Sequence, residues 1–224
     1  MSRGIIIVGN ESALLSAIES EMARRAERHA LALIPSRLSG SPLPNAAAAM
    51  APDAAAPSRI VLDWIPGSAI SARTLLIAAE NRLERIDEAV FVCDPPPAGR
   101  AVANVSIADV EVMLNDQVKG WFFLARELAA AFRARGGGTL ALVYPETAGK
   151  DEGLLESAAL AVFRSFTRSV LAEAGGEPYV ALGFSSGETG DEAGFAAFIA
   201  RQLDEANRRG SGKHHRYGKH GIFR

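Results

Sequence analysis

Short strands and amphipathic helices alternate along most of this chain, and that alternation limits its fold more than any other feature. Residues 4–8 read GIIIV, a β-branched run typical of a strand buried on both faces of a parallel sheet, and residues 12–29 carry helical periodicity. Further strands are expected at residues 30–34, 59–62, 89–93, 139–143 and 179–183. The pattern predicts an α/β fold with a Rossmann-like, doubly wound parallel sheet.

One domain is expected from a chain of 224 residues with 48% hydrophobic content. We assign it to residues 1–210. Residues 39–58 are rich in Ala, Pro and Ser and are predicted to form a loop or a short helix, and residues 191–209 a last amphipathic helix. The basic segment 211–224 is either a mobile tail or a final strand that docks on a partner.

Charge and hydropathy exclude two classes of partner. The formal net charge of −2 gives no excess that would hold a nucleic acid or an anionic membrane. No apolar run reaches the roughly 20 residues that a membrane-spanning helix needs. Cys93 is the single cysteine, and Met1 leads directly into the first strand without a signal-peptide pattern, so a cytoplasmic protein is expected.

Three segments carry a family resemblance: RLERIDEAVFVCD at residues 82–94, DQVKGWFFLARELA at 116–129 and GGGTLALVYP at 136–145. They resemble, in order and spacing, three segments of the short-chain dehydrogenase/reductase family. These are the run that ends in Asn-Ala-Gly, the helix with Asn-x-x-Gly, and the strand that ends in the catalytic serine. Residues 159–173 are similar to the helix that follows the family's Tyr-x-x-x-Lys. The resemblance spans nearly the whole chain.

The reactive residues of that family are replaced here. The resemblance places Pro145, or alternatively Tyr144, at the catalytic serine, Glu156 at the tyrosine, Leu160 at the lysine, Gln117 at the helix asparagine, and Val92 at the asparagine of Asn-Ala-Gly. Hydride transfer in the family needs a phenol whose pKa a nearby lysine lowers and a hydroxyl that holds the substrate oxygen. Leucine and proline supply neither, so no catalytic residue of the family is expected.

The cofactor turn is altered as well. Where the family has Gly-x-x-x-Gly-x-Gly, this chain reads GNESALL, and only Gly9 remains. Ala13 and Leu15 place side chains where the backbone must approach a pyrophosphate, and Glu11 adds a negative charge there. We therefore expect this chain to bind no cofactor, with NAD held by a partner subunit.

Other polar residues do not complete a site. Asp63 matches the family's aspartate after the third strand, and Arg37 an arginine of NADP-preferring members. Without the glycines, both are interpreted as vestigial or surface residues. The spacing of His214, His215 and His220 is not that of a metal site, so no metal is expected.

Aromatic residues gather on the two helices that, in the resembling family, pair with another subunit as a four-helix bundle. They are Trp121, Phe122, Phe123, Phe163 and Phe166. Three consecutive aromatics cannot all face one side, because neighbours on a helix are about 100° apart. We predict an interface at these residues. The alternative is that they face only this chain's own sheet.

Retained helices and lost chemistry favour a non-catalytic structural subunit that pairs with an active NAD-dependent short-chain dehydrogenase. A precedent is the two-subunit dehydrogenase of anaerobic toluene degradation, 2-(α-hydroxybenzyl)succinyl-CoA dehydrogenase, which has one degenerate subunit and acts on a hydroxyacyl-CoA. Two alternatives stay open. One is a regulatory module that binds a nucleotide or acyl-CoA, and the other is an enzyme with relocated residues such as Tyr144, Glu156 or the tail histidines.

Overall fold

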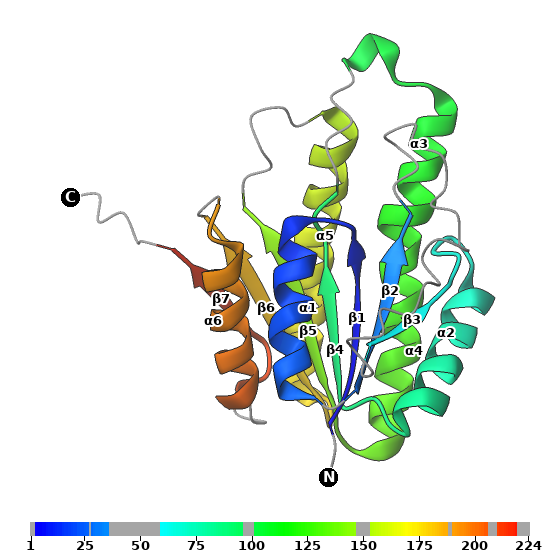
Figure 1. The fold of residues 1–224 in the computed structure, drawn as a ribbon. Coiled ribbons are helices and arrows are strands. Elements are labelled where there is room, and N and C mark those ends of the chain that lie inside the picture. Colours follow the sequence, from blue (N-terminus) through cyan, green and yellow to red (C-terminus); the bar gives the residue numbers. More distant parts are fainter. Residues whose placement is uncertain are drawn as a thin grey trace.

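The computed structural model describes residues 3–26, 28–35, 59–95, 101–146, 153–187, 190–205 and 210–218. The described residues form one sheet of parallel strands in the order β3-β2-β1-β4-β5-β6-β7, with helices on both faces (Figure 1). The predicted doubly wound parallel sheet is confirmed. The loop or helix expected at residues 39–58 lies outside the described residues, as do Arg37 and His220.

The strands are β1 Gly4–Asn10, β2 Arg28–Ile34, β3 Arg59–Leu62, β4 Glu88–Val92, β5 Thr139–Pro145, β6 Val180–Ser186 and β7 Lys213–Tyr217. The helices are α1 Ala13–Arg25, α2 Ala69–Leu83, α3 Ile107–Met113, α4 Gly120–Arg135, α5 Leu154–Glu173 and α6 Glu192–Glu205. A π-helical segment, η2 Leu114–Lys119, joins α3 to α4 into one long helix, and the short turns η1 Val102–Asn104 and η3 Ala174–Gly176 complete the order.

Two cores lie on the two faces of the sheet. In β1, Ile6 and Val8 point to the face covered by α2, α4 and α5, while Ile5 and Ile7 point to the face covered by α1 and α6. Every residue of β1 is buried. The continuous apolar run of this strand therefore reports burial on both faces, as expected for a parallel sheet.

The junction between the first helix and the second strand differs from the expectation. The helix expected over residues 12–29 ends at Arg25, because Ala26 adopts an extended conformation with φ −136° and ψ 142°. Strand β2 then begins at Arg28, two residues before the predicted start, and His29 pairs with Ile5 of β1. Polar residues at the start of β2 concealed this part of the strand from the apolar pattern.

The end of the chain adds a strand to this chain's own sheet. Residues 213–217 form β7, which pairs in parallel with β6 from Leu182↔Lys213 to Ser186↔Tyr217. The sequence left open a mobile tail or a strand docked on a partner. In the structure β7 forms the edge of the sheet beside β6, and α6 lies on the same side of the molecule (Figure 1).

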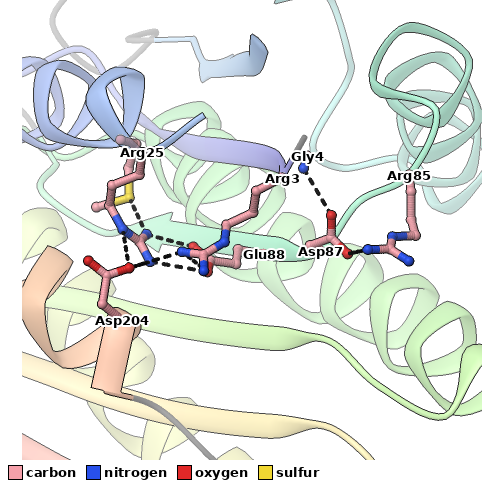
Figure 2. A network of polar contacts seen from close by, with 8 residues as sticks. Arg3, Gly4, Arg25, Arg85, Asp87, Glu88 and Asp204 are labelled. Atoms are coloured by element: carbon pink, nitrogen blue, oxygen red, sulfur yellow. Dashed lines mark hydrogen bonds and ion pairs between the residues drawn. The ribbon is translucent and has the colours of Figure 1, made fainter. Parts of the chain in front are cut away.

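Ion pairs fasten the amino ends of the strands (Figure 2). Arg25, at the end of α1, lies 2.6 Å from Glu88 at the start of β4 and 2.8 Å from Asp204 on α6. Arg3 reaches the same two carboxylates at 3.3 and 3.0 Å. The side chains of Arg25 and Glu88 are only 8% and 7% exposed. This group, the amino-edge network, ties α1, β4 and α6 together.

Candidate functional site

The positions that the family resemblance assigns to catalysis gather at the opposite edge, where the strands end. Val92 and Pro145 are the last residues of β4 and β5. Gln117 lies in η2, and Glu156 and Leu160 lie on α5. All of them except Pro145, which is half-buried, are buried. The positions assigned by the family resemblance therefore lie in one region of the molecule, and their side chains are packed against neighbouring residues.

The π-helical segment was missed by the sequence interpretation. It carries Gln117 and leads into Trp121, which are 2% and 1% exposed. Within the described part of the chain, neither the side-chain oxygen of Gln117 nor the indole N–H of Trp121 has a hydrogen-bond partner. π-helical turns occur often at functional sites, and unpaired buried polar groups are rare. The helix is therefore irregular at the position where the family carries its asparagine.

Tyr144 and His214 meet at this edge although 70 residues separate them. The Tyr144 hydroxyl lies 2.9 Å from His214 Nε2. Burial is the largest cause that raises the pKa of Tyr144 above its ordinary value, and burial lowers the pKa of His214. The phenol is therefore protonated and the imidazole neutral at pH 7. This is the reverse of the lowered phenol pKa that family chemistry requires.

Further polar contacts fasten β5 to its neighbours. The Ser185 hydroxyl donates to a carboxylate oxygen of Glu146 at 2.7 Å, and Arg216 of β7 lies 2.6 Å from the other oxygen. Arg164 of α5 donates to the backbone carbonyl of Glu146, and its guanidinium lies 5.7 Å from the centre of the Tyr144 ring. These contacts join β5, β6, β7 and α5. Sequence spacing gives no sign of them.

The turn after β1 does not fit a dinucleotide pyrophosphate. Leu15 is 3% exposed, and its Cδ1 lies 2.9 Å from the point where a Cβ on Gly9 would stand, so Leu15 fills the space above this glycine. The Leu15 backbone N–H donates to the Ser12 hydroxyl at 3.1 Å and is already satisfied. Asp94 lies beside Ser12, and burial, the largest cause, together with Glu192 raises the pKa of Asp94.

Other candidate residues give no site. Asp63 follows β3 and is exposed. His214 and His215 are neighbours in β7 and point to opposite faces of the sheet. In the part of the chain that the structure describes, no group of three or more His, Cys, Asp or Glu could hold a metal ion. No helix among those residues has the length and hydropathy to cross a membrane.

Solved structures resemble this chain over almost its full length. One, described as a 3-oxoacyl-reductase from Bacillus thuringiensis, has a TM-score of 0.70 at 10% identity, with 96% of each chain covered. Another, described as a short-chain dehydrogenase/reductase from Burkholderia xenovorans, has a TM-score of 0.71 at 14% identity, with 96% of this chain and 94% of that one covered. The chain has the short-chain dehydrogenase/reductase fold. No family model and no curated protein matches the sequence.

Most of the aromatic residues assigned to an interface lie inside the chain's own core. Trp121, Phe163 and Phe166 are buried, and the rings of Trp121 and Phe163 are 5.0 Å apart. Phe123 is partly buried against the same core. The interface prediction is therefore wrong for Trp121, Phe163 and Phe166, because these side chains point toward the sheet. Phe122 is the most exposed of the five, at 50%, and its ring lies 4.8 Å from that of Phe166.

An apolar strip that the sequence interpretation did not identify runs along the long helix. Its residues Ile107, Val110, Leu114 and Phe122 are exposed at 82%, 37%, 42% and 50%. The first three recur at intervals of three and four residues and so lie on one side of the helix. We call these four residues the α3–α4 strip. The segment IADVEVML carried the signal in the sequence, but the expected helix began only at residue 116.

Proposed function

We propose that this chain is a non-catalytic subunit that pairs with an active short-chain dehydrogenase. The proposal rests on one contrast. The fold and its long helices are retained, while buried Leu160 stands at the position of the lysine and Glu156 at that of the tyrosine. A partner would therefore supply both the NAD and the acid–base residues.

The surface of the long helix supports pairing. The α3–α4 strip leaves four large apolar side chains in water, and such patches mark association sites. Beside it, α5 exposes the small residues Ser157, Ala161 and Ser165 at intervals of four residues. A row of small side chains allows a second helix to approach closely. We propose that helices of the partner pack on this surface.

We propose an acyl thioester as the substrate class of the complex. The resemblance to 2-(α-hydroxybenzyl)succinyl-CoA dehydrogenase favours a hydroxyacyl-CoA, as in anaerobic aromatic degradation. The similar structure from Bacillus thuringiensis is described as a 3-oxoacyl-reductase, and the reduction of an oxo group is carbonyl chemistry as well. The substrate would be recognised by the active subunit, and steady-state kinetics of the purified complex with aromatic and aliphatic acyl-CoA series would identify it.

The first experiment isolates the native assembly. The protein is purified from its natural source without a tag on any candidate partner, and the intact assembly is weighed by native mass spectrometry. We expect a second chain of similar mass at fixed stoichiometry, with a Tyr-x-x-x-Lys motif in its sequence. An assembly that contains only copies of this chain, or dehydrogenase turnover by this chain alone, would contradict the proposal.

A variant pair tests the surface directly. We expect Leu114→Glu to lower the affinity for the partner by about 100-fold, because it places a charge in the centre of the apolar strip, where burying an unpaired charge costs several kcal/mol. The matched control is Ile77→Glu, since Ile77 of α2 is 51% exposed and lies outside the strip. Equal partner affinity for both variants would place the interface elsewhere.

Titration calorimetry with NAD tests the cofactor turn. We expect the isolated chain to bind NAD more weakly than about 1 mM, because Leu15 fills the turn and the negative charges of Glu11 and Asp94 lie beside it. The double variant Ala13→Gly, Leu15→Gly restores the glycine pattern and is expected to bind NAD more tightly. Micromolar binding by the unchanged chain would refute this interpretation of the turn.

A further inference from the structure

Strand β7 has an unusual composition for part of a sheet. Its five residues read KHHRY and include no aliphatic side chain. Among the described residues it pairs only with β6 and forms one edge of the sheet. Its attachment depends on backbone pairing and on the contacts of four side chains. These are His214 with Tyr144, His215 with Phe184, Arg216 with Glu146, and Tyr217 with Asp191.

The imidazole of His214 is seated over a glycine. A Cβ at Gly183 of β6 would stand 2.7 Å from His214 Cδ2 and 3.1 Å from the Thr167 methyl group of α5. Only glycine therefore leaves room for the ring at this place. The Tyr144 hydroxyl of β5 lies 2.9 Å from Nε2, and the Glu146 carboxylate, one residue beyond β5, opposes the effect of burial by raising the pKa of the ring.

His215 occupies the opposite face. Its ring stacks on Phe184 of β6, with centroids 5.4 Å apart and an interplanar angle of 19°, and meets Phe198 of α6 edge-on at 6.4 Å. The charged groups that act on it are cations, Lys213 on β7 and His214 once protonated. From α6, the Arg201 guanidinium lies 5.6 Å from the Phe198 ring. A protonated His215 would therefore be repelled by Lys213 and by protonated His214.

We infer that β7 is a pH-dependent strand, docked on β6 while His214 and His215 are neutral and released when acid protonates both. Protonated Nε2 would donate to the Tyr144 oxygen instead of accepting from it, so the hydroxyl proton of this buried residue loses its acceptor. Two new charges beside Lys213 and Arg216 would give four cations in five residues. Release would expose the backbone edge of β6 to other extended segments.

The direction of the pH effect follows from the two histidines. Burial, the largest cause in each case, lowers the pKa of His214 and of His215 below the ordinary value of 6.5. The released strand then binds more protons than the docked strand between the lowered pKa and 6.5. Docking is fully favourable above pH 6.5 and weakens as the pH falls through this window.

Hydrogen exchange tests this inference on the unchanged protein. Peptides that cover residues 210–218 are followed by mass spectrometry at pH 7.5 and 5.0, with exchange times scaled for the intrinsic rate. We expect a loss of protection at pH 5.0 in β7, because the pKa values of both histidines are lower in the docked strand, and no change in peptides from α4. Equal protection of β7 at both pH values would overturn the inference.

A double variant assigns the effect to the histidines. His214→Gln keeps an acceptor for Tyr144, and His215→Phe keeps the stack on Phe184, while neither new side chain titrates. Protection of β7 in the double variant should then be independent of pH. The control Lys213→Gln removes a charge but retains both histidines, so its response should follow the unchanged protein. A double variant that keeps the full pH response would also overturn the inference.

Discussion

Replacing Arg25 by methionine is expected to lower the free energy of unfolding by about 3–5 kcal/mol, the usual effect of removing one partner from a buried ion pair. The variant leaves Glu88, whose side chain is 7% exposed, with only the half-exposed Arg3 as a cation. Asp204 also loses one of its two arginines. The loss should appear as a lower midpoint in urea unfolding of the isolated chain.

Two further variants serve as controls for that result. Arg24 precedes Arg25 on α1 but its side chain is 70% exposed, so Arg24→Met should change stability by no more than about 0.5 kcal/mol. Arg25→Met combined with Glu88→Leu removes both buried charges and should regain most of the lost stability, because the uncompensated carboxylate is gone. If Arg25→Met and Arg24→Met proved equally stable, the amino-edge network would make no measurable contribution to the free energy of unfolding.

Trp121→Ala is expected to lower the stability of the isolated chain by about 3–5 kcal/mol, as large-to-small changes of buried aromatic residues do. The indole is 1% exposed and lies between Phe91 of β4 and Phe163 of α5, at centroid distances of 5.2 and 5.0 Å. Its removal leaves a cavity on the face of the sheet that α4 covers. The effect should be present without any partner.

Phe122→Ala is the matched change on the next residue. Its ring is half-exposed and touches Phe166, so truncation should cost the isolated chain about 1 kcal/mol or less. Its larger effect should be on partner affinity. Thermal unfolding of the two variants, alone and in the complex, separates the core residue from the surface residue. A Trp121→Ala chain as stable as the Phe122→Ala chain would restore the predicted interface at Trp121.

Apolar runs predicted the strands from β1 to β6. The run GIIIV located β1, and residues 59–62 were predicted with the bounds that β3 has, because both are dominated by β-branched or aliphatic residues. Apolar periodicity did not predict strand β7. Its cationic and aromatic residues give no apolar pattern, and only pairing with β6 makes it a strand. The π-helical segment likewise has no local signal.

The candidate site was predictable only as a set of positions. The resemblance assigned Gln117 to the helix asparagine of the family and Leu160 to its lysine, and both residues are buried, in η2 and α5. It could not place His214 beside Tyr144, since a contact across 70 residues depends on how β5, β6 and β7 are ordered. Side-chain direction was the other missing quantity. The side chains of α4 point in turn to the core and to solvent, and it is Phe122, rather than Trp121, that faces outward.

The amino-edge network lies at one end of the strands, while Val92 and Pro145 end β4 and β5 at the other. Mutations at the carboxyl edge therefore leave the buried Arg25 and Glu88 pair untouched. The same separation offers a protein engineer a scaffold whose carboxyl-edge loops can be exchanged while the anchoring charges stay in place.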